Sequence, residues 1–390
     1  MTRTLFLALR LVAMPILIAF VIVIETHHSP NYFRLLSFVL VLFLLIDLAS
    51  LARGKLRDLL LIAVSLAFGA SVIEGIAYLI EPKQIIVSTD GYTVRRPVIG
   101  WGPEHPGRFH SEKIDPSTGA TIYSVDYTID ANLLRRTDSN EADPAIVFFG
   151  DSMTFGLGVN DADTLPQALA DSLDRKNRVL NLAFGGYGPQ QFLRELETGI
   201  FDPVIGRQPK LFIFMTSPWH AERSACKVSW VLLAPRYEVE NGHVQFKGSC
   251  YEGGRLALQE WLWNSAAYRV SMSALRSKLS HDDIETYIQI TLAAVRLAKE
   301  KYGVDTVVPF VRAAPNYLPG TAFDNEAIMQ RLKDGGAIVI DVTLEKEAAA
   351  GAAIAIEGDG HPTPLANHLR AEMLKSLIAT HERGELLSRQ

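Results

Sequence analysis

Three long apolar stretches near the amino terminus constrain the fold of this chain more than any other feature. Each is close to the roughly 20 residues that a helix needs to cross a bilayer. They cover residues 4–24, 33–51 and 58–80. The alternative is a signal peptide followed by buried core helices, but no small-residue cleavage site follows the first stretch. The sequence therefore predicts a membrane anchor of three transmembrane helices within residues 1–82.

Charged residues inside these stretches are placed where a membrane helix tolerates them. Arg10 lies near the start of the first stretch, from which its side chain can extend to the interface. Asp47 lies near the end of the second stretch. Glu74 lies inside the third, so we expect it to face another helix or the interface.

The loops between the stretches predict the orientation of the anchor. The first loop has no Lys or Arg, whereas the second contains Arg53, Lys55 and Arg57. Positively charged loops stay in the cytoplasm, so the amino terminus and the second loop are expected there. We therefore expect a multi-pass protein of the inner membrane, with everything after about residue 82 periplasmic or otherwise extracytoplasmic.

Composition adds constraints on compartment and partners. The net charge is −5 and no long basic run occurs, which argues against binding to nucleic acid. The two cysteines, Cys226 and Cys250, both lie in the outer part. A disulfide between them is favoured there over two unpaired thiols. Nothing nearby indicates metal ligation, and we expect no metal and no cofactor.

Residues 144–382 alternate short apolar runs with amphipathic stretches. Strands that are apolar on both faces and alternate with helices indicate a parallel sheet covered on both sides. The predicted strands are 145–149, 178–183, 210–215, 305–310 and 337–341. The predicted helices are 163–175, 189–200, 283–302, 324–334 and 364–380. The predicted fold class is α/β, with a five-stranded parallel, flavodoxin-like sheet that binds ligands at the carboxyl ends of its strands.

Two further segments lie before or within this alternation of predicted strands and helices. Residues 83–143 contain Pro, Gly and short alternating runs, and we interpret them as a connector with a few strands that could pack on the next domain. Residues 217–282 form an insertion between the third strand and its helix, with a hairpin turn at Asn241-Gly242. This insertion is either a lid or substrate-binding surface, or a decoration held by the disulfide.

Ser152 follows the first predicted strand directly, at the edge of the sheet where active sites usually lie. A serine there is often only a helix cap. Near the other end of the chain, Asp359 and His361 precede the last predicted helix. These three side chains are able to form a nucleophilic relay, in which Ser152 attacks, His361 takes its proton and Asp359 orients the imidazole.

The turn after the second predicted strand reads NLAFGGYGPQQ, residues 181–191. Its glycines allow the backbone to approach a ligand closely. A free amide there, together with that of Ser152, is suited to stabilise an oxyanion. A tight strand-to-helix turn explains the same glycines without any function.

The order of these motifs resembles that of the SGNH/GDSL hydrolase family over about residues 144–380. Gly-Asp-Ser comes first, then Asn-x-x-x-x-Gly, then Asp-x-His near the carboxyl end. The resemblance implies Ser152 as nucleophile, Gly186 as an oxyanion donor, His361 as base and Asp359 as the third member. Members of this family hydrolyse or transfer acyl groups on esters, often of carbohydrates or lipids, without a metal.

The chain departs from that family pattern in three places. Met153 replaces the usual Leu, and the Gly-x-Asn-Asp motif after the third strand is missing. His220 or Arg223 is a candidate donor in place of the missing asparagine, His220 being slightly favoured. The alternative is that they only hold the insertion in place. The acid often lies three residues before the histidine, but Asp359 lies two before, so Glu357 is an alternative.

The sequence favours a membrane-anchored serine esterase or O-acyltransferase acting on acyl esters, acetyl above all, of a cell-surface or exported carbohydrate. A lipid ester is the rival substrate. Transfer from a cytoplasmic donor would need a partner membrane protein, so hydrolysis is favoured. The competing class is a non-catalytic protein for polysaccharide binding or assembly that retains the fold. A hydrogen-bonding distance between Ser152 and His361 discriminates between the two classes.

Overall fold

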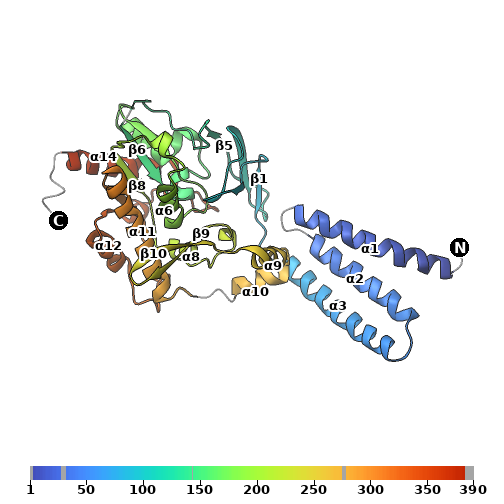
Figure 1. Cartoon of the computed structure of the whole chain (residues 1–390). Coiled ribbons are helices and arrows are strands. Elements are labelled where there is room, and N and C mark those ends of the chain that lie inside the picture. Colours follow the sequence, from blue (N-terminus) through green and yellow to red (C-terminus); the bar gives the residue numbers. More distant parts are fainter. Residues whose placement is uncertain (1–2, 28–31, 143, 275–277, 383–390) are drawn as a thin grey trace. The chain divides into compact units, whose positions relative to one another are not determined.

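The computed structural model describes residues 3–27, 32–142, 144–274 and 278–382 (Figure 1). The chain divides into two compact units. The first contains residues 1–83 and 251–277, and the second contains residues 84–250 and 278–390. Most of the first predicted loop, residues 28–31, lies outside the described residues.

The second unit is built on a five-stranded parallel sheet with the strand order β12-β11-β8-β6-β7. The strands are β6 (Ala145–Phe149), β7 (Arg178–Asn181), β8 (Leu211–Phe214), β11 (Thr306–Phe310) and β12 (Ile338–Asp341). This is the doubly wound, flavodoxin-like order, and the predicted fold class is confirmed. Every residue of β6 is buried, because helices cover both of its faces.

Helices pack on the two faces of this sheet (Figure 1). On one face, α5 (Leu165–Ser172) and α14 (Pro364–Glu382) share a core with Ile146 and Phe148 of β6. On the other face, α11 (His281–Tyr302) and α12 (Asn325–Asp334) share a core with Val308 and Phe310 of β11. Helix α6 (Pro189–Thr198) adds Phe192, whose ring lies 4.4 Å from that of Phe149. Each predicted strand and helix is present, with ends shifted by a few residues.

Residues 84–143 are part of the second unit and are more than a connector. The strands β1 (Ile85–Ser88), β4 (Gly107–Ile114) and β5 (Thr121–Ile129) form an antiparallel sheet, and β2 (Val94–Arg96) pairs with β3 (Gly100–Gly102). Phe109 and Tyr127 of this sheet are fully buried. Residues 84–142 therefore belong to the same compact unit as the parallel sheet.

The insertion predicted at residues 217–282 divides between the two units. The second unit keeps α8 (His220–Ser224), the hairpin of β9 (Pro235–Glu240) and β10 (His243–Ser249), and a disulfide between Cys226 and Cys250. The first unit receives α9 (Gly253–Trp263) and α10 (Ala266–Ala274).

The first unit also contains α1 (Arg3–His27), α2 (Phe33–Leu51) and α3 (Gly54–Ile80). By length and composition alone, α2 and α3 are each able to cross a membrane, whereas the described apolar part of α1, Leu9–Val23, is shorter. The Nη2 atom of Arg10 lies 3.1 Å from Oδ2 of Asp47, so this side chain forms an ion pair with α2.

Glu74 of α3 is buried and holds the start of α10. Its carboxylate accepts hydrogen bonds from Oγ of Ser265 at 2.6 Å and from the N–H groups of Ala266 at 2.7 Å and Ala267 at 3.2 Å. A carboxylate at a helix amino terminus satisfies N–H groups that otherwise lack acceptors. The predicted orientation of Glu74 toward another helix is thus observed, and that helix comes from the insertion.

Candidate active site

The structure brings Ser152, His361 and Asp359 together at the carboxyl edge of the parallel sheet. Ser152 begins α4 (Ser152–Phe155), which follows β6, and the other two residues lie in the loop before α14. The Nε2 atom of His361 lies 2.8 Å from Oγ of Ser152. Its Nδ1 atom is hydrogen-bonded to Oδ2 of Asp359, which also accepts the backbone N–H of His361 at 3.2 Å.

The hydrogen-bond network assigns the direction of this relay. A buried carboxylate accepts, so Nδ1 of His361 carries the proton that Asp359 receives, and Nε2 accepts from the Ser152 hydroxyl. Burial alone would raise the pKa of Asp359, but the hydrogen bonds from His361 and Lys113 outweigh it and hold that pKa well below its usual range. Asp359 is therefore ionised at neutral pH and fixes the imidazole.

Lys113 of β4 contacts the third member of the relay, a contact that sequence reasoning missed. Its Nζ atom lies 2.8 Å from Oδ1 of Asp359, and its side chain is only 10% exposed. The alternation of β4 contained a signal for it, because Lys113 falls on the same inward face as Phe109 and Ser111. An inward-facing lysine on a half-buried strand requires a partner.

Asp151, next to the nucleophile, is the centre of a separate buried cluster. Its Oδ2 atom accepts from Nε2 of His220 at 3.0 Å and from Nη1 of Arg223 at 2.9 Å. Its Oδ1 atom accepts the N–H of Met153 at 2.9 Å. The two residues suggested as oxyanion donors thus both donate to Asp151, and the structure does not direct them to the nucleophile.

His220 is neutral in this cluster. Burial and then the charge of Arg223 lower its pKa to about 4. Its Nδ1 atom lies 2.8 Å from Oγ1 of Thr216, which donates to it, so both ring nitrogens are engaged. Burial alone would raise the pKa of Asp151, but Arg223 and His220 hold it far below its usual range. The cluster therefore fixes the turn that presents Ser152.

The backbone amides of Ser152 and of Gly186, in the glycine turn after β7, have no acceptor within the described part of the chain. Nη1 of Arg223 also donates to the carbonyl of Tyr187, which ties the glycine turn after β7 to Asp151. Gly186 in that turn has a φ of 83°, which favours glycine. Among the described residues, neither the N–H of Gly186 nor that of Ser152 is hydrogen-bonded. Both are available to a ligand oxygen.

Two tryptophan rings border Gly186. A Cβ atom on this glycine would lie 3.0 Å from Cδ1 of Trp230 and 3.2 Å from Cζ2 of Trp101. Trp101 is buried and its indole N–H donates to the carbonyl of Gly185 at 2.8 Å. Trp230, from the insertion, is 49% exposed. The insertion thus contributes an accessible aromatic side chain beside the candidate oxyanion donor.

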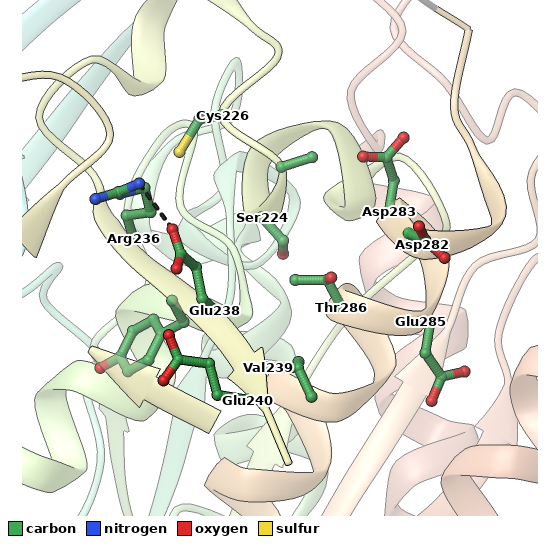
Figure 2. A pocket seen from close by; sticks show the side chains of 12 residues that line it. Ser224, Cys226, Arg236, Glu238, Val239, Glu240, Asp282, Asp283, Glu285 and Thr286 are labelled. Carbon is green, nitrogen blue, oxygen red and sulfur yellow. Dashed lines mark hydrogen bonds and ion pairs between the residues drawn. The ribbon is translucent and has the colours of Figure 1, made fainter. Parts of the chain in front are cut away.

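A pocket of about 640 Å³ lies between β9, α8 and the start of α11, and no relay residue lines it. Figure 2 shows its carboxylates on β9 and α11. Four of them are held in ion pairs, namely Glu238 with Arg236, Glu240 with Lys247, Asp283 with Lys227 and Glu285 with Arg331. Within the described ranges, no group of three His, Cys, Asp or Glu residues is placed to hold a metal ion.

No protein-family model matches the chain, and no curated protein matches it. Solved structures do match. A putative lipolytic protein of the G-D-S-L family from Desulfitobacterium hafniense is 15% identical, with 59% of this chain and 97% of that chain covered and a TM-score of 0.36.

Two esterases match in the same way. The esterase EstA from Pseudoalteromonas is 13% identical, with 62% and 100% covered and a TM-score of 0.38. AlinE4, an SGNH-hydrolase family esterase, is 16% identical, with 62% and 98% covered and a TM-score of 0.33. At these identities and TM-scores the matches carry no argument about activity, which rests on the site itself.

Proposed function

We propose that this chain is a serine ester hydrolase that forms an acyl-enzyme on Ser152. The observation that carries the proposal is the 2.8 Å separation between Oγ of Ser152 and Nε2 of His361. This is hydrogen-bonding reach without any loop movement, and it disfavours the non-catalytic alternative. A retained but idle fold has no need to keep a nucleophile, a base and an ionised orienting acid aligned.

The first half of the reaction transfers the acyl group to the enzyme. Oγ of Ser152 attacks the ester carbonyl while its proton passes to Nε2 of His361. The carbonyl oxygen becomes an oxyanion, which the N–H groups of Ser152 and Gly186 are free to bind. The ester C–O bond then breaks, and His361 gives its proton to the departing alcohol.

The second half returns the free enzyme. Water attacks the acyl-enzyme and loses a proton to His361, and a second oxyanion forms in the same place. This oxyanion collapses, the bond to Ser152 Oγ breaks, and His361 returns its proton to that oxygen. Asp359 stays ionised throughout and stabilises the imidazolium. A sugar hydroxyl in place of water would make the same step an acyl transfer.

We further propose an acyl ester, acetyl above all, of an exported or cell-surface carbohydrate as substrate, outside the cytoplasm. The apolar α2 and α3 support a membrane anchor. The disulfide between Cys226 and Cys250 supports an oxidising compartment. The indole of Trp230 beside Gly186 offers a flat, half-exposed surface of the kind that suits a ligand ring. A lipid ester is the other outcome to test.

The direct test uses the full chain in detergent with p-nitrophenyl acetate and a fluorophosphonate probe. Wild type should turn over the ester and be labelled at Ser152, and Ser152→Ala should lose both. If wild type is inactive and the probe does not label it, the non-catalytic binding protein becomes the favoured alternative. Release of acetate from an acetylated polysaccharide, compared with release of fatty acid from a lysophospholipid, then separates the two substrate classes.

A reporter test addresses location. Alkaline phosphatase, which is active only outside the cytoplasm, would be fused after residue 54 or after residue 83. We expect activity only from the second fusion. The reverse pattern would contradict the proposed orientation.

A further inference from the structure

We propose that Lys113 is a positioning residue whose charge sets the pH range in which His361 acts as the base. The inference rests on the proposed function, because it concerns the same relay. It assigns a role in the site to residues 84–143, which precede the hydrolase motifs in the sequence.

The geometry places Lys113 directly on the relay. Its Nζ atom lies 2.8 Å from Oδ1 of Asp359, while Oδ2 of the same carboxylate is bonded to Nδ1 of His361. The side chains are 10% exposed for Lys113 and 3% for Asp359. Solvent therefore screens this pair only weakly, unlike an ion pair on the surface.

Two tyrosines lie on the strand beside this pair, and neither carries a charge that competes with Lys113 for Asp359. Tyr123 and Tyr127 lie on β5, the strand next to β4, where the charge of Asp359 acts on both of them. Burial, more than the charge of Asp359, raises the pKa of Tyr123 to about 12, and the pKa of Tyr127 is raised for the same reason. Both phenols are thus neutral when the enzyme works.

The remaining charges of β4 lie on its other face. Arg108, His110 and Glu112 alternate with the inward side chains, and Arg108 pairs with Asp126 on the exposed side. Ser152 approaches His361 from α4 and is uncharged. Within the described residues, the relay carboxylate is therefore held between one imidazole and one ammonium group.

In this arrangement the carboxylate of Asp359 interacts with Lys113 and His361 at the same time. An imidazolium that forms on His361 is stabilised by Asp359, and the ammonium of Lys113 offsets part of that stabilisation. Lys113 therefore disfavours protonation of the base and extends catalysis to lower pH. Removing the charge alone should move the acidic limb of the pH–rate profile to higher pH.

A purely structural role predicts something else. If Lys113 only holds Asp359 in place, its loss lowers kcat at every pH and leaves the acidic limb where it was. The two roles are separated by a variant that keeps the hydrogen bond and removes the charge. Lys113→Gln removes the charge and keeps an N–H donor on a side chain that is one bond shorter, while Lys113→Arg keeps both the charge and the donor.

The experiment measures kcat/KM for p-nitrophenyl acetate, and the rate of inactivation by a fluorophosphonate, from pH 5 to 9 on the full chain in detergent. We expect the acidic limb of Lys113→Gln to lie about half a pH unit or more above that of wild type. Lys113→Arg should keep the wild-type limb. Inactivation should shift with turnover, because it uses the same base.

Several outcomes would overturn the inference. The charge of Lys113 does not set the pH range of the base if the acidic limbs of the Lys113→Gln and Lys113→Arg profiles coincide. The same conclusion follows if the acidic limb of Lys113→Gln moves to lower pH. If Lys113→Gln does not fold, the acidic limb is measured on Lys113→Met instead, after thermal unfolding has shown that this variant is folded. A wild type that the probe does not label refutes the proposed function itself, whereas a labelled wild type with coincident limbs refutes only the role of Lys113.

Discussion

Asp359 is hydrogen-bonded to Nδ1 of His361 although the two residues are only two positions apart in the sequence. A turn with Gly358 and Gly360 at positive φ brings the carboxylate beside the ring. The departure from a three-residue spacing therefore does not prevent contact between acid and base.

Asp359→Asn should lower kcat for p-nitrophenyl acetate by about 10³-fold or more, with a small change in KM. The amide does not stabilise the imidazolium and favours the wrong tautomer. Glu357→Gln is the matched control, since Glu357 is exposed and lies two residues earlier in the same loop. Equal activity losses in the two variants, measured by steady-state kinetics, would contradict the assignment of Asp359.

Gly186→Ala should lower kcat/KM by about 10- to 100-fold, because the turn that presents the oxyanion amide must shift. A Cβ atom there meets both Trp230 and Trp101, at a φ of 83° that disfavours any side chain. Gly185→Ala is the matched control, since its Cβ would meet nothing within 4 Å. A wild-type rate for Gly186→Ala would remove Gly186 from the site.

The parallel sheet and the relay were predictable because local patterns determine both. Strands buried on two faces give continuous apolar runs, and helices give a 3.6-residue period. Side chains that follow such strands meet at one edge of the sheet. Ser152 and His361 were therefore recognisable although they lie 209 positions apart.

The alternation of β4 indicates that Lys113 is buried, but its contact with Asp359 and the role of His220 depend on long-range packing and were not predictable. Lys113 reaches Asp359 across 246 positions, through a sheet whose pairing no local pattern specifies. The missing asparagine motif made His220 and Arg223 plausible oxyanion donors. Only the structure reveals that buried Asp151 needs both of them as partners.

Arg223→Met should lower the free energy of unfolding by about 3–5 kcal/mol, because it leaves the Asp151 carboxylate buried without its main counter-charge. Arg236→Met is the matched control on the same insertion. Its partner Glu238 is half exposed, so its loss should cost less than about 1 kcal/mol. Chemical denaturation followed by tryptophan fluorescence measures both, and similar costs would contradict the importance of the buried cluster.

Glu195 of α6 should make stability fall as pH rises. The residue is 3% exposed, its Oε1 atom has no hydrogen-bond partner in the described part of the chain, and burial raises its pKa well above the usual value. Below the ordinary carboxyl pKa, Glu195 is protonated in both the folded and the unfolded protein, and stability does not change with pH. Above it, folding costs about 1.4 kcal/mol per pH unit until the folded pKa is reached.

Glu195→Gln removes that linkage. The variant should gain stability relative to wild type between pH 5 and pH 7, measured by denaturant unfolding at several pH values. A difference in unfolding free energy that stays constant over this range would mean that Glu195 is ionised in the folded protein.

Glu74→Ala should release the start of α10 from α3 without disturbing α3 itself. The carboxylate accepts three hydrogen bonds there, and charge-assisted bonds contribute about 1.5–3 kcal/mol each. Amide exchange at Ala266 and Ala267 should therefore accelerate by about 10- to 100-fold, as measured by hydrogen-exchange mass spectrometry on the full chain.

The exchange rate of Glu74→Gln should lie between those of wild type and Glu74→Ala, since its amide retains one acceptor oxygen. Asp58→Ala, at an exposed position of the same helix, is the control and should leave this exchange unchanged. Protection that persists in Glu74→Ala would mean that other contacts, such as Arg269 with Glu81, hold α10 in place.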